Sequence, residues 1–152
     1  MPKIGAHVSA AVSLDLSFER ALNIGAEATQ IFISPPRQWV QIEHKEGMIA
    51  NYKKRAGETQ ITPNFIHGTY LINLGSGNAE HLQKSIDWLI WALNMAGKLG
   101  SLGLIFHIGS YKWRGFEAVR GQIIKAFSVI LGSTTTPESS KERILDALHL
   151  PE

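Results

Sequence analysis

Three histidines could do chemistry, because each follows an apolar run at the point where a buried strand would end. His7 follows "KIGA", His67 follows "TPNFI" and His107 follows "GLIF". In parallel α/β proteins, functional groups gather where strands end and the following loops begin. Neutral imidazoles that converge there can bind zinc or act as acid–base groups. The plainer alternative is that each ring only hydrogen-bonds to nearby backbone, and the residue types leave both interpretations open.

The side chains that would complete a metal site are scarce. The chain has no cysteine, which excludes cysteine-ligated zinc and a disulfide framework. The acidic residues before position 132 fall in expected helices or at their starts, and Glu27 precedes a strand. A hydrolytic zinc site usually combines imidazoles with carboxylates, so the pattern supplies only part of one. His44 and His81 lie in polar contexts and are expected to be solvated.

Basic, aromatic and apolar side chains occupy the loops after three of the expected strands. "SPPRQW" carries Arg37, "HGTYLIN" carries Tyr70 and Leu71, and "YKWRG" carries Lys112. On one rim, such groups could contact a nucleic-acid backbone and wedge a base step. The alternative is that Leu71 packs inward and Arg37 is merely solvated, and residue types alone favour it. The net charge of +2 permits an anionic partner without requiring one.

The elements that must position these residues alternate between short apolar runs and amphipathic segments. The pattern predicts strands over 3–8, 28–34, 62–67 and 102–108, and helices over 14–24, 44–56, 79–96 and 116–131. Ser13 is a candidate N-cap for the first helix and Gly25 its stop. Strands this apolar are typical of a parallel sheet buried on both faces. The fold class is therefore α/β, and four βα units fit either a small open sheet or half of a (β/α)₈ barrel.

Length and composition limit how the chain can be divided into domains. With 152 residues, 44% of them hydrophobic, it can form one ordinary domain with a core. Residues 1–131 carry the four βα units, whereas 132–152 form a divergent polar tail that could contain a short helix. No signal peptide or membrane-spanning stretch is apparent, and a cytoplasmic location is expected.

Four segments together resemble the endonuclease IV family, the zinc-dependent apurinic/apyrimidinic endonucleases of base-excision repair. They are "KIGAHVSAA", "IFISPPRQW", "HGTYLINLG" and "FHIGS", in this order, and the resemblance covers about residues 3–131. It implies the amino-terminal half of a xylose-isomerase-like TIM barrel. His67 and His107 match zinc ligands of a site holding up to three ions, and His7 would be a rim contact. The implied reaction is hydrolysis of the phosphodiester 5′ to an abasic site.

The same resemblance implies a partner and several departures. The partner is double-stranded DNA with abasic sites, contacted through Arg37, Tyr70 and Leu71. Val12 and Ser13 stand where the family usually has a glycine pair. The family's next ligand is a glutamate in a segment like "LENTAG", which is not found in 132–152. The sequence interpretation is therefore a truncated endonuclease, weakly active or inactive.

Two other functions stay open. One is a non-catalytic DNA-binding remnant, and the other is a metal-dependent sugar isomerase or epimerase on the same barrel. A half barrel would also leave the outer edges of its first and fourth strands unpaired. Unpaired edges invite pairing with another chain, so self-association is expected.

Overall fold

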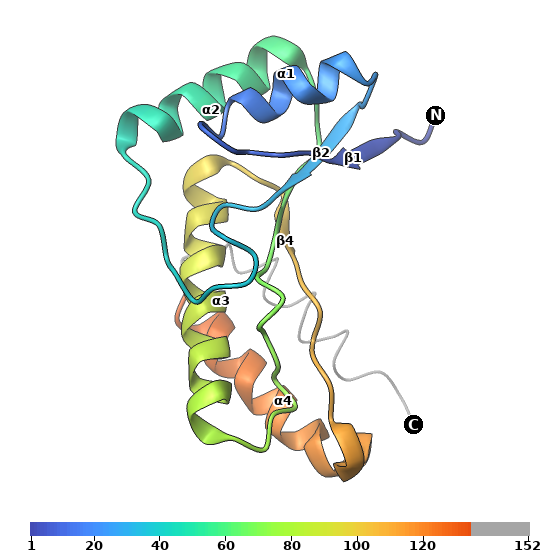
Figure 1. Cartoon of the computed structure of the whole chain (residues 1–152), viewed down its shortest axis with the longest axis vertical. Helices are drawn as coiled ribbons and strands as arrows, with labels where there is room; N and C mark the ends of the chain where they lie inside the picture. Colours follow the sequence, from blue (N-terminus) through green and yellow to red (C-terminus); the bar gives the residue numbers. More distant parts are fainter. Residues whose placement is uncertain (135–152) are drawn as a thin grey trace.

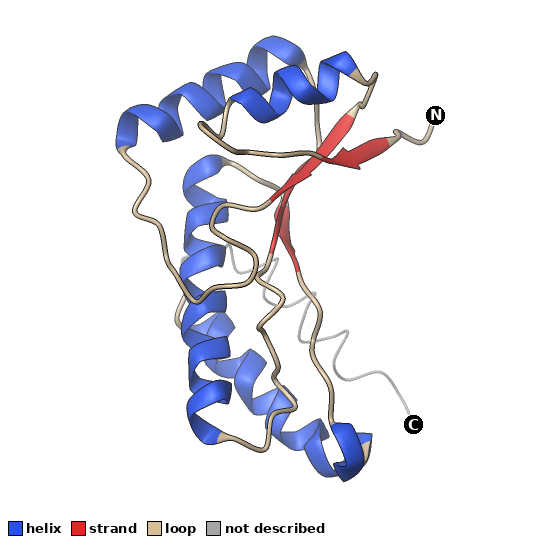
Figure 2. Ribbon diagram, viewed as in Figure 1, coloured by secondary structure: helices blue, strands red, loops and turns tan. Residues whose placement is uncertain are grey.

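A computed structural model describes residues 1–134 as four successive βα units (Figures 1 and 2). The sheet is parallel in the order β1-β2-β3-β4, formed by β1 (Gly5–His7), β2 (Ala28–Ile31), β3 (Asn64–His67) and β4 (Gly103–Ile105). The strands alternate with α1 (Leu16–Asn23), α2 (Glu46–Thr59), α3 (Ala79–Leu99) and α4 (Phe116–Gly132), and a 3₁₀ turn, η1 (Lys112–Arg114), precedes α4. This order confirms the predicted α/β fold, a partial barrel of parallel βα units.

The two faces of the sheet differ in burial. Ile31 and Ile66 are fully buried in the core that the helices form with the sheet. The opposite face carries His7, Gln30 and Ile105, and Ile105 is 42% exposed. The expectation that the strands are buried on both faces is therefore wrong. Within residues 1–134, β1 and β4 each pair with a single strand, and no second layer covers the face that would line a closed barrel.

The strands are shorter than the apolar runs that predicted them. The last pair between β3 and β4 joins His67 to Ile105, so the ladder stops where β3 stops although the apolar run continues to Ile108. Similarly, β2 ends at Ile31 rather than at residue 34. The ladder continues only as single backbone hydrogen bonds, from the Val8 N–H to the Gln30 carbonyl and from the Gly68 N–H to the Ile105 carbonyl, so the segments beyond the strands lead directly into the rim loops.

Helix ends follow local capping more than hydrophobic pattern. Asn78 caps α3 by accepting the His81 N–H at 2.9 Å, and the helix continues past Gly97 to end at Gly100, whose φ is +69°. Glycine tolerates this left-handed conformation without strain. The predicted cap at Ser13 is wrong, because α1 starts only after Asp15. The Ser13 hydroxyl instead donates to the Asp15 carboxylate.

Replacing Val12 by glycine should stabilise the protein by about 1 kcal/mol. Val12 has φ +77° and is 91% exposed, so a β-branched residue holds a left-handed conformation without packing in return. Such strain typically costs about 1–3 kcal/mol, and the flexibility that glycine adds to the unfolded chain offsets part of the gain. Urea unfolding measures the change. Val40→Gly is the control, since Val40 is exposed without positive φ, and it should be neutral or destabilising.

Residues 135–152 lie outside the described part of the chain. The predicted polar tail, its short helix and the division near residue 131 therefore stay predictions. Among the described helices, none combines the length and the apolar character needed to cross a membrane.

Candidate metal and nucleic-acid site

Five aromatic rings meet where the strands end, and we call this group the rim cluster. His67 is at its centre, with ring centroids 5.6 Å from His7, 5.0 Å from Phe32, 5.4 Å from His107 and 5.6 Å from Tyr70. Each ring lies at or just beyond the carboxyl end of a strand. The three histidines singled out by the sequence are thus brought together, and Phe32 is a member that sequence reasoning missed. The alternation in "IFIS" could have revealed it, since Ile31 and Ile33 point into the core.

His67 is held in one tautomer. The residue is 7% exposed, and its Nδ1 lies 2.7 Å from the Gly68 carbonyl oxygen. A carbonyl can only accept, so Nδ1 carries the proton and donates it. The lone pair of Nε2 is then available to a metal, and a backbone acceptor on the other nitrogen is the arrangement that orients metal-binding histidines.

His107 lies two residues past β4 and is exposed. The preceding Phe106 packs against the core and contacts the Phe127 ring, so the alternation of the extended chain turns His107 toward the rim. Two imidazoles bound to one tetrahedral zinc ion have centroids about 5 Å apart. The 5.4 Å between the rings of His67 and His107 fits that separation.

His7 is arranged differently. The Gln30 side-chain amide donates to its Nδ1 at 2.9 Å, which leaves the proton on Nε2. Burial lowers the pKa of His7, and repulsion from His67 lowers it further. In this arrangement the neutral His7 ring offers its Nε2–H to the rim, which suits it to donating a hydrogen bond.

The residues present fit only part of a zinc site. Among residues 1–134, no group of three or more His, Cys, Asp or Glu side chains is placed to hold a metal ion. Tetrahedral zinc takes four ligands, and a catalytic site keeps three from the protein. His67 and His107 can supply two, so further donors would have to come from outside the described residues.

The loops after β2 and β3 are joined at one atom. The Pro36 carbonyl oxygen accepts the Tyr70 N–H at 2.8 Å and the Thr69 hydroxyl at 2.8 Å. Arg37 is exposed directly beside this junction, and Tyr70 is 52% exposed. Leu71 is half-buried. The structure therefore presents Arg37 and Tyr70 together at the rim, with Leu71 beside them and less exposed than either.

His44 and His81 are not solvated as expected. His81 Nε2 donates to the Leu71 carbonyl at 2.7 Å, and its ring meets Trp39 edge-on at 5.3 Å. His44 Nε2 donates to the Ile33 carbonyl at 2.8 Å. Both are structural residues that hold loops next to the rim. A polar sequence context could not reveal this, because the acceptors are carbonyls ten and eleven residues away along the chain.

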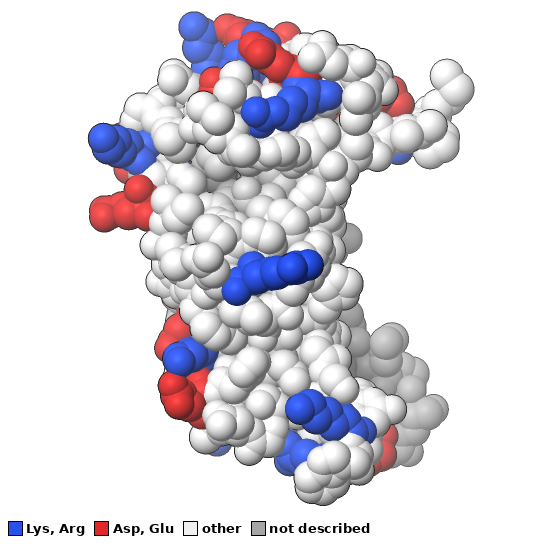
Figure 3. Space-filling model, in the orientation of Figure 1, with Lys and Arg blue, Asp and Glu red and all other residues white. Residues whose placement is uncertain are grey.

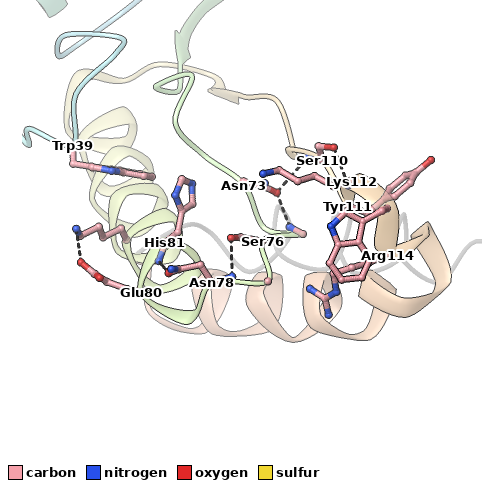
Figure 4. A pocket seen from close by; sticks show the side chains of 14 residues that line it. Trp39, Asn73, Ser76, Asn78, Glu80, His81, Ser110, Tyr111, Lys112 and Arg114 are labelled. Atoms are coloured by element: carbon pink, nitrogen blue, oxygen red, sulfur yellow. Dashed lines mark hydrogen bonds and ion pairs between the residues drawn. The ribbon is translucent and has the colours of Figure 1, made fainter.

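Two basic side chains near the strand ends, Arg37 beside the rim cluster and Lys112 in η1, are not neutralised by acidic partners among the described residues. In the part of the chain that the structure describes, neither Arg37 nor Lys112 makes an ion pair. The ion pairs that do form there join residues on the helices. Figure 3 shows acidic and basic side chains mixed along the upper helices and the left edge of one face, while a basic patch in the middle of that face has no acidic neighbour in view. Lys112 lies apart from the rim cluster, in η1, where it lines a neighbouring cavity (Figure 4).

Comparisons with known proteins identify the family of the fold. The family model for xylose isomerase-like TIM barrels matches residues 18–136. A probable endonuclease 4 from Sulfurihydrogenibium sp. (strain YO3AOP1) is 35% identical over 130 residues, which are 86% of this chain and 47% of the relative. One from Persephonella marina is 38% identical over 124 residues, 81% of this chain and 44% of the relative. The chain thus spans about half the length of the curated relatives it matches.

Solved structures point the same way. Endonuclease IV from Thermus thermophilus superposes with a TM-score of 0.79 at 25% identity, covering 90% of this chain and 48% of that one. The Escherichia coli 3-keto-D-glucoside 4-epimerase superposes at 0.61 with 14% identity, covering 88% and 52%, a likeness of fold alone. The chain therefore belongs to the xylose isomerase-like TIM barrel family, and within that family it resembles the endonuclease IV proteins.

Proposed function

We propose that this chain carries the imidazole ligands and the DNA-contacting loops of an endonuclease IV-type phosphodiesterase. The substrate would be double-stranded DNA with an abasic site, hydrolysed on the 5′ side of the lesion with zinc as cofactor. The observation that supports this most is the 5.4 Å separation of the His67 and His107 rings beside Tyr70. The names of the curated relatives support the same class of activity.

Each residue has a distinct role in this proposal. His67 Nε2 and His107 would hold zinc, which when bound supplies Lewis-acid stabilisation of charge on a phosphate. Arg37 would contact the phosphate backbone, and Tyr70 with Leu71 would occupy the space of the displaced abasic nucleotide. Displacement is cheap at such a site because no base pair has to break. Since the described residues supply two ligands only, we expect this chain by itself to bind DNA and to cut it weakly or not at all.

The test compares a duplex containing one abasic site with the intact duplex, with zinc present. We expect tighter binding to the abasic duplex, weakened strongly by salt because phosphate contacts release counterions. Equal affinity for the two duplexes, or affinity that ignores salt, would contradict the proposal. Rapid incision by this chain alone would contradict the expected weak activity. Abasic preference without any incision, even after zinc and the carboxyl-terminal half of a related endonuclease 4 are supplied, would favour the non-catalytic alternative.

Replacing Tyr70 by alanine should remove most of the preference for the abasic duplex, a loss of about tenfold. Stacking of an aromatic side chain on a base is typically worth about 1–3 kcal/mol. Arg37→Gln should instead weaken binding to both duplexes and reduce the salt slope by about one. Fluorescence anisotropy at several salt concentrations measures both effects.

Arg120→Gln is the matched control for this pair. Arg120 is exposed on α4 and pairs with Glu117 at 3.6 Å, outside the rim. Because it removes only one distant charge, the change should alter DNA binding less than about twofold. A loss as large as that of Arg37→Gln would mean that binding follows net charge and not the rim.

A further inference from the structure

A polar cavity of about 500 Å³ lies between the loops that follow β3 and β4, beside the rim cluster and not within it (Figure 4). Its volume is in the range of small-molecule sites, about 300–1,000 Å³. Trp39, Asn73, Ser76, Asn78, Lys112 and Arg114 are among the residues that line it. We propose that this cavity binds a nucleotide, with its phosphate at Arg114 and Lys112 and its base stacked on Trp113.

Two basic side chains of the cavity, Arg114 and Lys112, are not paired with an acidic side chain of the described residues. Arg114 Nη1 is buried and has no hydrogen-bond partner, although a buried guanidinium nitrogen normally finds one. Neither Arg114 nor Lys112 forms an ion pair within the described residues. The Glu80 carboxylate also lines the cavity, but Lys84 neutralises it at 2.7 Å, and Figure 4 shows Glu80 on the side away from Arg114. An anion bearing several acceptor oxygens would supply the partner that Arg114 lacks, and the flexible Lys112 ammonium lines the same cavity.

The walls of the cavity are fixed before any ligand arrives. Asn73 Oδ1 accepts the Gly75 N–H at 3.0 Å and the Ser110 N–H at 3.1 Å, which ties the two loops together. Gly109 passes so close to Asn73 that any side chain there would collide with it. The Ser110 hydroxyl in turn accepts the Lys112 N–H at 3.0 Å. A preformed site loses less entropy on binding than one that must first be ordered.

The exposed aromatic side chains beside the cavity indicate which chemical group the bound anion carries. Trp113 is 90% exposed and Tyr111 is 46% exposed, and both border the cavity. An indole left in water forfeits most of the free energy that its burial would contribute. Stacking on a base would recover part of it, and it does not depend on which base is present. A phosphate joined to a base is therefore a better fit than an inorganic anion.

The experiment titrates the full chain with dAMP, deoxyadenosine and inorganic phosphate, followed by calorimetry. We expect dAMP to bind at least about tenfold more tightly than either fragment. Arg114→Gln and Lys112→Gln should each weaken dAMP about tenfold, and Trp113→Ala should weaken dAMP without changing inorganic phosphate. Arg120→Gln is the control and should have no effect. Equal affinities for the three ligands, or equal losses with Arg120→Gln, would overturn the proposal.

Two further measurements identify the natural source of the nucleotide and distinguish binding in this cavity from binding at the rim cluster. A six-nucleotide single strand that competes with dAMP and binds more tightly would identify a strand as the natural source of the nucleotide, whereas binding of dAMP alone would identify a free nucleotide. His67→Ala should leave the affinity for dAMP unchanged. A loss of dAMP affinity in this variant would show that dAMP binds at the rim cluster, which would refute the cavity proposal without refuting the proposed function. Lys112 is exposed, and an unchanged unfolding midpoint for Lys112→Gln keeps its loss of binding interpretable.

Discussion

Replacing His67 by alanine is expected to lower zinc affinity by about 100-fold or more. His67 offers Nε2 while Nδ1 is fixed on the Gly68 carbonyl, and the His107 ring lies 5.4 Å away. Removing even an outer-shell partner of a metal ligand typically costs about 10–100-fold, and removing a ligand outright should cost at least as much. A chain with one remaining imidazole would then bind zinc no better than an ordinary surface histidine.

Calorimetry with zinc measures the affinity, and thermal unfolding provides an independent reading. A ligand at about 100 times its dissociation constant stabilises the folded state by about 2.7 kcal/mol, so zinc should raise the melting temperature of the unaltered chain and not that of His67→Ala. His7→Ala is the control, because the Gln30 amide occupies its Nδ1 and the proton lies on Nε2. Equal losses with His7→Ala and His67→Ala would show that zinc does not distinguish the two rings.

The chain is also expected to self-associate as its concentration rises. β1 and β4 form the two edges of the described sheet, and apolar side chains are exposed at both, with Ile4 76% and Leu102 72% accessible. Open strand edges pair readily with other strands, and a lysine at such an edge is a device that prevents it. Ile4→Lys and Leu102→Lys should each raise the dissociation constant of the assembly at least about tenfold, or about 1.4 kcal/mol.

Sedimentation equilibrium distinguishes the 16.8 kDa monomer from larger species. Ile42→Lys is the control, since Ile42 is 37% exposed on the loop before α2 and lies at neither sheet edge. It adds the same charge and should leave the assembly intact. A monomer at every concentration, or dissociation by Ile42→Lys as well, would contradict association through the edges.

The sequence predicted the order of the elements and the meeting of the histidines, because both follow from periodicity and from the common direction of parallel strands. His7, His67 and His107 needed only to end three strands of one sheet to become neighbours. Their roles as ligands stay predictions, as do the DNA contacts of Arg37, Tyr70, Leu71 and Lys112.

Features that depend on contacts between distant loops could not be predicted. The length of β4 is set by where β3 ends, and the apolar run to Ile108 gives no sign of it. The use of His81 to hold the Leu71 carbonyl, and the cavity around Arg114, arise from segments whose approach only the tertiary structure defines. The exposed inner face was mispredicted because apolar strands look the same whether or not a second layer covers them.

The carbonyl oxygen of Pro36 connects the loops after β2 and β3, so we expect the two loops to move together. If either loop moved alone, the Tyr70 N–H or the Thr69 hydroxyl would lose its acceptor, so a displacement of one segment must carry the other. If the proposed DNA binding is correct, Arg37 and Tyr70 would meet the duplex as one rigid unit. Such a unit would favour duplexes of matching shape, because neither contact can adjust without the other.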